Sequence, residues 1–331
     1  MRLKKILSLL ILSVLALSLM SCGKNKNIRF GTDNKNGVYN TYAGSLMEHA
    51  KQDGLSDATV IKETAGSYEN LTLMRDGLLD IAIVEDDALY NAASGKGKFA
   101  DNPYTGARVV ANLYTEPCQI VVSKASKIKS VSDLNGKRIS VGVEESGAEN
   151  IAEEILKSAG IDESMIEKYN YTPADAAKAM REDRIDAFFV VSAFPDTIID
   201  DLSKEMDINV LSLDDDTIEY MMNLYPGYQA IVIPSWTYEN QESVVITIGA
   251  KAVLVADEKF DSKKVNILTE AIFNHSSEIN TELGEGSCPD MAFATDNIEG
   301  TLHEGAKMYY DSKCLSQKTD EQTGQIIYTF E

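Results

Sequence analysis

Residues 74–84 read Met-Arg-Asp-Gly-Leu-Leu-Asp-Ile-Ala-Ile-Val, and residues 180–190 read Met-Arg-Glu-Asp-Arg-Ile-Asp-Ala-Phe-Phe-Val. Every matched position is separated by 106 residues. In both segments the end of a helix is followed by a tight turn and by an apolar strand that begins directly after an aspartate, Asp80 or Asp186. Such a repeat predicts two similar α/β lobes facing one cleft, with chance or a shared turn chemistry as the alternative explanation.

Alternating strands and helices precede both segments. Apolar runs predict the strands, and turn or capping residues predict where the helices begin. Before the first segment these elements are a strand at Ile28–Gly31, a helix from Val38, a strand at Thr59–Ile61 and a helix capped by Ser67. Before the second they are a strand at Arg138–Val143, a helix opened by a Ser146–Glu149 capping box and a helix starting at Thr172-Pro173. The expected fold class is therefore α/β.

Two apolar, strand-like stretches connect the expected lobes. The chain would cross at Glu116–Val122 and return at Ala250–Ala256. Lobe 1 would then comprise residues 28–118 and 257–331, and lobe 2 residues 119–256. One long helix from Asp261 to Leu283 is expected to pack back on lobe 1, because its apolar residues recur at helical spacing.

The N-terminus has the features of an export signal. Arg2, Lys4 and Lys5 precede an apolar run from Ile6 to Met20 that stops at Cys22. The run is shorter than the roughly 20 residues that span a bilayer, so a signal peptide over residues 1–21 is expected, with an uncleaved anchor helix as the alternative. Leu19-Met20-Ser21-Cys22 resembles a bacterial lipobox, which predicts a lipidated Cys22 and a polar tether over residues 22–27. The protein would be anchored in the periplasm or on the outer face of the cell membrane.

Charge and cysteine content exclude several classes of function. Without residues 1–21 the chain has 28 basic and 52 acidic residues, a net charge of −24, so nucleic acid is an unexpected partner. Cys118, Cys288 and Cys314 show no metal-binding spacing, and no cofactor is expected. Cys288 and Cys314 either pair as a disulfide or serve as small buried apolar residues.

Three turns lead into helices at the carboxyl ends of expected strands, where α/β proteins bind ligands. For each turn, the alternative to ligand binding is that the polar residues only cap the helix. Aromatic residues near strand ends add a second resource for a small-molecule cleft. The candidate ligand-binding residues from these two sources are Thr32, Asn34, Lys35, Tyr39, Ser67, Asn70, Ser146, Gly147, Ala148, Phe194 and Tyr228.

Catalytic motifs do not compete with this interpretation. The chain has three histidines, His49, His275 and His303, and it lacks GxSxG, HExxH, P-loop and GxGxxG motifs. An enzyme is therefore not expected.

Taken together, many short stretches resemble one known family, the TAXI-type solute receptors of TRAP transporters. These stretches are Gly31-Thr32, Gly37-Val38-Tyr39, Gly66 to Leu71, Leu113 to Pro117, Ser132 to Gly142, Ser146-Gly147, Ile185 to Val190 with Pro195, Tyr225-Pro226, Ile233-Pro234, and His303 to Ala306. The resemblance implies a two-lobed fold of the periplasmic-binding-protein type II class, with a ligand cleft between the lobes. It also implies delivery of a small organic acid or amino acid, including glutamate-like solutes, to a two-component TRAP membrane permease driven by an ion gradient.

Departures from the family pattern lie at the expected cleft. Asp33, Asn34 and Lys35 replace a glycine-rich turn, Ala148 replaces a threonine, and Glu85 stands where glutamine is common. By this comparison Lys35 would pair with a ligand carboxylate and Glu85 with an ammonium group, which together suit an amino acid. An ABC-type receptor and a surface interaction lipoprotein without a transport role are the alternative functions.

Overall fold

The computed structural model describes residues 27–35, 37–225, 227–284, 286–320 and 324–330. The expected signal peptide, the lipobox with Cys22 and most of the tether lie outside these ranges. Within them, every helix is too short or too polar to cross a bilayer.

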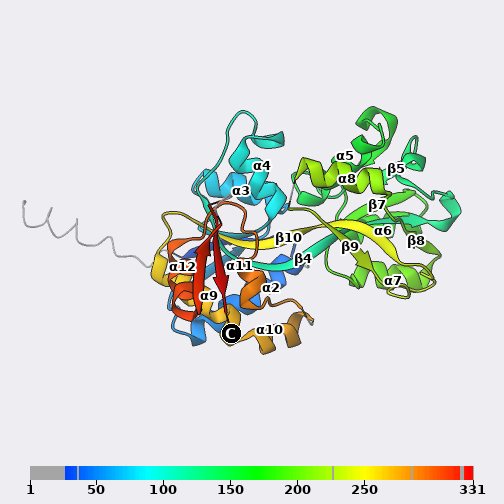
Figure 1. Cartoon of the computed structure of the whole chain (residues 1–331). Coiled ribbons are helices and arrows are strands. Elements are labelled where there is room, and N and C mark those ends of the chain that lie inside the picture. The colour runs from blue at the N-terminus through cyan, green and yellow to red at the C-terminus, as the bar shows by residue number, and fades with distance from the viewer. Residues whose placement is uncertain (1–26, 36, 226, 285, 321–323, 331) are drawn as a thin grey trace, which may run out of the picture.

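Lobe 1 is built on a five-stranded sheet with the order β2-β1-β3-β10-β4. Its strands are β1 (Ile28–Gly31), β2 (Thr59–Lys62), β3 (Ile81–Glu85), β4 (Ala107–Ser123) and β10 (Val245–Asp257). Its helices are α2 (Val38–Gln52), α3 (Ser67–Arg75), α4 (Asp86–Ser94), α9 (Ser262–Asn274), α10 (Ser276–Leu283), α11 (Met291–Thr295) and α12 (Glu304–Lys313). A hairpin of β11 (Ser316–Thr319) and β12 (Ile326–Thr329) follows near the C-terminus (Figure 1).

Lobe 2 repeats this topology with the order β6-β5-β7-β4-β8. Its own strands are β5 (Arg138–Ser140), β6 (Glu167–Tyr169), β7 (Ala187–Val191), β8 (Ile208–Val210) and β9 (Gln229–Ile233), and its helices are α5 (Gly147–Ser158), α6 (Pro173–Arg181), α7 (Thr197–Glu205) and α8 (Asp215–Leu224). In both orders the first three strands are parallel to one another. Each of the next two strands is antiparallel to the strand before it. The two-lobed α/β fold expected from the repeated segment is confirmed.

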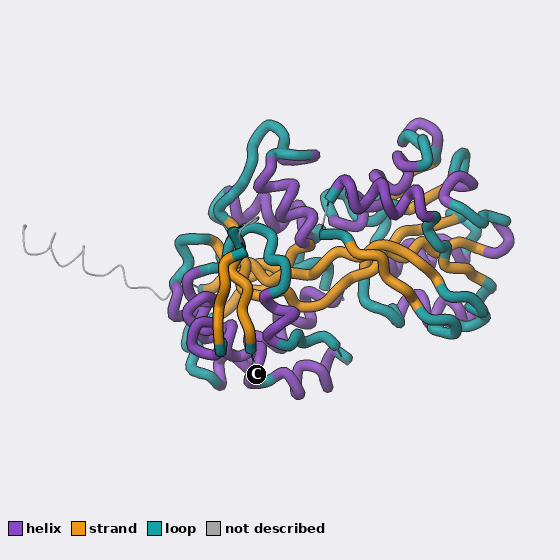
Figure 2. The backbone as a smooth tube through the Cα atoms, viewed as in Figure 1, coloured by secondary structure: helices purple, strands orange, loops and turns teal. Residues whose placement is uncertain are grey.

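Two long strands connect the lobes (Figure 2). Strand β4 pairs with β10 up to Pro117 and with β7 from Cys118 onward. Strand β10 pairs with β9 up to Gly249, and its residues 250–257 pair with β4 or β3 of lobe 1. Gly249 pairs with both β9 and β4, so the pairing of β10 passes from β9 to the lobe 1 strands there.

Helices cover both faces of each sheet, so each lobe has two apolar cores. In lobe 1, α2, α9 and α12 pack on one face and α3 and α4 on the other. In lobe 2, α5 and α8 pack on one face and α6 and α7 on the other. Adjacent strand residues such as Phe188 and Phe189 belong to opposite cores, because side chains alternate across a strand. This layering leaves the carboxyl ends of the parallel strands free for a site.

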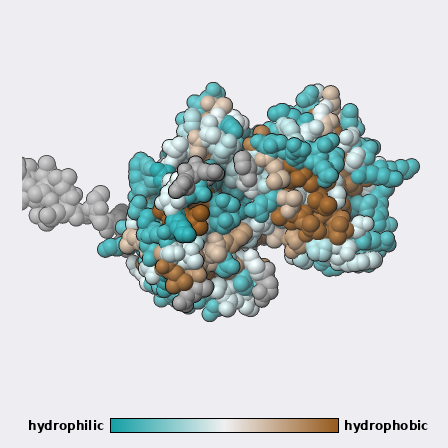
Figure 3. Space-filling model, in the orientation of Figure 1, coloured by the Kyte–Doolittle hydropathy of each residue, from teal (hydrophilic) through white to brown (hydrophobic). Residues whose placement is uncertain are grey.

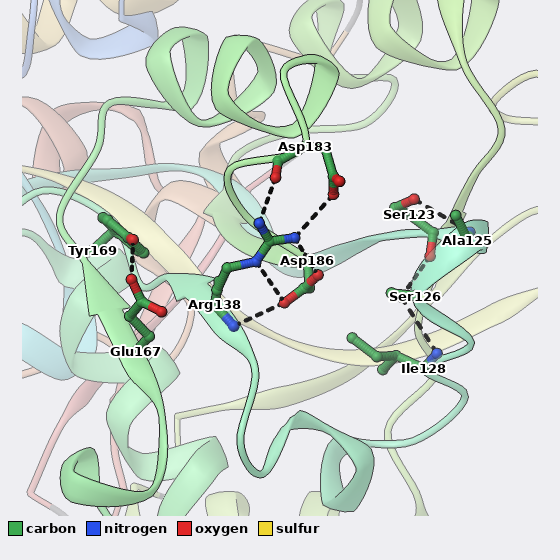
Figure 4. Close-up of polar contacts among 9 residues, drawn as sticks. All are labelled: Ser123, Ala125, Ser126, Ile128, Arg138, Glu167, Tyr169, Asp183 and Asp186. Carbon is green, nitrogen blue, oxygen red and sulfur yellow. Dashed lines mark hydrogen bonds and ion pairs between the residues drawn. The ribbon is translucent and has the colours of Figure 1, made fainter.

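The repeated segments form the same side-chain network in both lobes. In lobe 1, the carboxylate of Asp80 accepts hydrogen bonds from the backbone N–H and the Nε of Arg29, at 2.8 and 2.9 Å. In lobe 2, Asp186 accepts the same two bonds from Arg138, at 2.9 and 3.1 Å. Figure 4 shows the second network, in which the Arg138 guanidinium also reaches Asp183. In each lobe the aspartate lies in the turn before one strand (β3 or β7) and holds the arginine near the start of the neighbouring parallel strand (β1 or β5).

Replacing Asp186 with asparagine is expected to lower the free energy of unfolding by roughly 1–3 kcal/mol, because it weakens bonds to a guanidinium and a backbone N–H at a part-buried site. Asp183→Asn is the matched control. Its carboxylate contacts the same guanidinium but is 94% exposed, so a change below about 0.5 kcal/mol is expected. Denaturant unfolding of both variants measures the difference, and equal effects would contradict the buried role of Asp186.

The predicted long helix Asp261–Leu283 is wrong in one respect, since the structure divides it into α9 and α10 at His275. The ring of His275 stacks on His49 at 4.5 Å, and its Nε2 lies 3.1 Å from the Asp53 carboxylate. These contacts with the end of α2 hold the break. As expected, the two helices pack on lobe 1.

Cys118, Cys288 and Cys314 are all free, so the disulfide alternative does not hold in this structure.

Strand β9 and the start of β10 expose Val232 and Ile246, with Val244 beside them. Figure 3 shows the corresponding apolar area over the central strands of lobe 2.

Candidate functional site

A cavity of about 560 Å³ lies between the lobes. Lobe 1 contributes the turn between β1 and α2, the start of α3 and the end of β3. Lobe 2 contributes the starts of α5, α6 and α7 and the end of β7. The carboxyl ends of strands and the first turns of helices from both lobes therefore face one volume, which is large enough for a small organic molecule.

Most of the candidate residues from the sequence lie around this cavity. Lobe 1 places five residues on its wall, including Glu85 at the end of β3. Lobe 2 places three residues opposite. These residues are Asn34, Lys35, Tyr39, Ser67, Glu85, Ser146, Gly147 and Ala148. Segments more than 100 residues apart in the chain thus meet at one site.

Thr32 and Asn70 do not line the cavity. Both are fully buried and hold the turn beneath it. The Asn70 side-chain amide donates to the carbonyls of Thr32 and Ile83, at 2.7 and 3.0 Å, while the Thr32 hydroxyl donates to Lys62 O at 3.1 Å. Their polar groups are satisfied by the backbone, so they position the wall of the cavity and do not face it.

The two aromatic candidates lie elsewhere. Phe194 lines a neighbouring hollow that shares Val38 and Ser192 with the cavity. Tyr228 is buried, and its hydroxyl donates to the Asp87 carboxylate at 2.6 Å. That bond joins lobe 2 to the start of α4 in lobe 1, so Tyr228 contributes to the contact between the lobes.

Ser67 has a different role from the helix cap that the sequence predicted. The capping position belongs to Gly66, whose φ of 124° suits glycine alone. The Ser67 hydroxyl donates to Glu85 Oε2 at 2.9 Å and accepts the Glu85 backbone N–H at 3.0 Å. Ser67 therefore fixes the carboxylate of Glu85 at the wall of the cavity.

The predicted cap at Ser146 is present, since its hydroxyl accepts the backbone N–H of Glu149 at 3.1 Å. The Glu149 carboxylate, however, accepts the N–H of Glu145 and not that of Ser146, so the reciprocal half of the capping box is shifted by one residue. A further contact of Glu149 crosses the cleft, because Lys98 Nζ of lobe 1 lies 2.7 Å from its Oε2. The start of α5 is thereby tied to lobe 1.

Glu85 of lobe 1 packs closely against Gly147 of lobe 2. A Cβ atom placed on Gly147 would lie 1.2 Å from Glu85 Oε2 and 2.1 Å from its Cδ. Any side chain at residue 147 would therefore occupy the volume of the Glu85 carboxyl group. Glycine at the first position of α5 is a requirement of this closed arrangement.

The electrostatics of the lobe 1 wall are dominated by buried carboxyl groups. Burial, followed by the charge of Asp87, raises the pKa of Glu85 well above its ordinary value. Burial also raises the pKa of Glu116 to about 8, although the Tyr39 hydroxyl donates to Glu116 Oε2 at 2.6 Å. The pKa of Asp86 rises to about 7 through burial and the charge of Asp87. These carboxyl groups therefore favour the protonated form in the free protein, and a nearby positive charge would favour their ionised form.

Sequence reasoning missed several residues of the cavity wall. Glu116 was assigned to an apolar crossing strand, although a single glutamate within such a strand signals a buried functional or paired group. Asp33, which the comparison with the resembling family placed at the expected cleft, lines the cavity, and its carboxylate accepts the Asn40 backbone N–H at 3.0 Å. Among the described residues, the His, Cys, Asp and Glu side chains form no group that would hold a metal ion.

The sequence profile of one family, described as NMT1-like, matches residues 30–313. The chain belongs to the NMT1-like family. The match spans both lobes and every segment that lines the cavity.

Several solved structures align over most of this NMT1-like protein. A protein from Bordetella bronchiseptica RB50 aligns with a TM-score of 0.52 at 20% identity, covering 86% of this chain and 83% of the other. The alkanesulfonate-binding protein SsuA from Xanthomonas axonopodis pv. citri, bound to MOPS, aligns at 0.47 and 14%, with 86% and 82% coverage. PhnD1 from Prochlorococcus marinus, in complex with methylphosphonate, aligns at 0.49 and 12%, with 93% and 94% coverage.

Proposed function

We propose that this protein is an extracytoplasmic receptor that closes on a small organic solute and delivers it to a membrane transporter. The observation that carries this proposal is the cavity of about 560 Å³ whose wall is shared between the two lobes. A ligand in this position contacts both lobes, so its binding favours the closed form over an open one. The topology supports the same function. Within the described residues the chain passes between the lobes only along β4 and β10, so bending at these two strands would open and close the cleft.

The strand pairing supports a proposed division of the chain. We propose that residues 28–117 and 250–330 form lobe 1 and that residues 118–249 form lobe 2, a small revision of the boundaries expected from the sequence. The hinge would then lie at Pro117-Cys118 on β4 and at Gly249 on β10. Gly249 suits a hinge in one further respect, because a Cβ there would lie 3.0 Å or less from side chains on both neighbouring strands.

For the transporter we propose a TRAP permease, on the basis of the sequence resemblance to TAXI-type receptors. The solute would be a small organic acid or an amino acid. We propose binding without turnover, since the described residues that line the cavity include neither histidine nor cysteine. Co-purification with the many-span subunit of a TRAP permease would support this partner, whereas capture by a permease that works with an ATPase would favour an ABC-type receptor.

A thermal-shift screen tests the receptor function. A ligand at 100 times its dissociation constant stabilises the folded protein by about 2.7 kcal/mol, a clear rise in the unfolding temperature. We expect at least one organic acid or amino acid to produce this rise, and mass spectrometry of the recovered compound to show it unchanged. A recovered compound of altered mass would contradict binding without turnover.

We also propose that Cys22 carries a lipid anchor. Cys22→Ser is expected to move the protein from the membrane fraction to the soluble fraction of lysed cells, because lipid attachment requires the thiol. Immunoblotting of the two fractions measures the change, with Cys314→Ser as a control that leaves the protein membrane-bound. A Cys22→Ser protein that stayed with the membrane would contradict the anchor.

A further inference from the structure

We propose that the cavity receives the protonated amino group of a cationic solute between Glu85 and Glu116. This inference rests on the proposed receptor function and narrows its ligand to basic amino acids or diamines, in preference to glutamate-like dicarboxylates.

Strand register places the two carboxylates on one face of the sheet. Glu85 on β3 and Tyr114 on β4 are both paired with Ala252 of β10, while Glu116 is paired with Ala250. Residues two apart on a strand point to the same face, so Glu116 and Tyr114 flank β10 on the side that Glu85 also faces. Both glutamates line the cavity, although they come from strands on opposite sides of β10.

Each glutamate has one carboxylate oxygen that accepts no hydrogen bond from the described part of the chain. Glu85 is 4% exposed and Glu116 is 3% exposed. Ser67 and Tyr39 donate to the Oε2 atoms, and no described residue donates a hydrogen bond to either Oε1. The Tyr114 hydroxyl, which lines the neighbouring hollow, is also buried without a hydrogen-bond partner among the described residues. Buried carboxylates and hydroxyls in proteins almost always have partners, so these groups point to a donor that the ligand supplies.

The described residues that line the cavity include no buried cation for this purpose. The described lining of the cavity contains six carboxylates and one cationic side chain, Lys35, which is exposed. The buried lysine of the adjacent strand, Lys251, lies between Ala250 and Ala252 and therefore points to the opposite face. Its Nζ donates to Asp296 O at 2.7 Å there.

An ammonium group matches these requirements. It carries one positive charge and three N–H donors, which suits the carboxylate oxygens of two glutamates. Succinate would bring two negative charges, and glutamate two carboxylates with only one ammonium group, to a wall of acidic side chains. Like charges at close range in a buried site repel strongly. Lys35 at the exposed side of the cavity can then meet a single carboxylate of a basic amino acid.

Isothermal titration and thermal shift with five probes test the proposal. L-lysine, L-arginine and putrescine represent the cationic class, and L-glutamate and succinate the acidic class. We expect at least one cationic probe to bind and the two acids to bind at least tenfold more weakly. Because bound amine holds Glu116 ionised, binding near pH 7 is expected to release protons, which titration in buffers of different ionisation enthalpy detects.

The variants Glu85→Gln and Glu116→Gln keep the shape of each side chain and are expected to weaken binding of the cationic probe at least tenfold. Glu48→Gln, which changes an exposed glutamate on the outer part of α2, is the matched control and is expected to change it less than twofold. Binding of glutamate or succinate in preference to the amines would overturn this inference and leave the receptor function intact. No binding by any probe, together with no small molecule on the purified protein, would overturn both.

Discussion

Gly147→Ala is expected to weaken solute binding by about 10- to 100-fold, which corresponds to the ~1–3 kcal/mol that overpacking a well-packed contact costs. The new methyl group would occupy the position of the Glu85 carboxyl group, with 1.2 Å to its Oε2. To make room, Glu85 has to leave its hydrogen bond with Ser67, or the lobes have to open. Both changes remove the arrangement that holds the solute. Titration of the best-binding probe against this variant measures the loss.

Gly44→Ala is the matched control for this variant. Gly44 lies within helix α2, and a Cβ atom there meets nothing within 4 Å. Alanine is favoured over glycine inside a helix by about 1 kcal/mol, so this control should be slightly more stable than the wild type and bind with unchanged affinity. Gly147→Ala should also fold normally, because it changes the first residue of α5 to a better helix former. Equal affinities for Gly147→Ala and the wild type would show that the lobes do not close as described.

The ligand-free protein is expected to lose stability as the pH rises from about 5 to 9. Burial raises the pKa of Glu116 from 4.5 to about 8 in the folded protein. A group whose pKa is higher in the folded state stabilises that state fully below its unfolded value, and this stabilisation disappears as the pH rises through the folded value. For Glu116 the window runs from about 4.5 to 8, and Asp86 adds a second window that ends near 7.

Glu116→Gln isolates the contribution of this one carboxyl group. Near pH 5 the variant and the wild type are expected to unfold at similar temperatures, because Glu116 is protonated in the folded wild type. At pH 9 the variant should be more stable by a few kcal/mol, on the order of 5 °C or more, because one pKa unit corresponds to about 1.4 kcal/mol. Differential scanning calorimetry across this pH range measures both curves. Parallel curves would mean that Glu116 is not buried as an unpaired carboxyl group.

The repeated segment predicted the fold well because it reflects a local constraint. In each lobe an aspartate in the turn before a strand binds the arginine of the neighbouring parallel strand. This contact needs the same residues in both lobes, so Asp80 and Asp186 recur at the same offset. Helix starts were also predicted well, because Thr172 and Ser146 cap the helices that follow them. The break at His275 was missed, because it depends on a ring contact with His49, more than 200 residues away in the chain.

The cavity wall was predicted only in part, for a different reason. A polar residue in a turn at the end of a strand has two uses, facing a ligand or satisfying the backbone, and the sequence does not distinguish them. Thr32 and Asn70 satisfy backbone groups, whereas Ser67 supports a wall residue, Glu85. Glu116 depends on strand register across β10, which brings it to the same face as Glu85 and which no local pattern reveals.

Native mass spectrometry of the wild-type protein and the Gly147→Ala variant, isolated side by side from the same cells, tests the closed cleft most directly. We expect the wild type to carry one noncovalently bound small molecule per chain that contains an amino group, and the variant to have lost most of it. The same molecule on both proteins in equal amounts would contradict the account, and so would a wild-type protein that carries none and takes up none of the five probes.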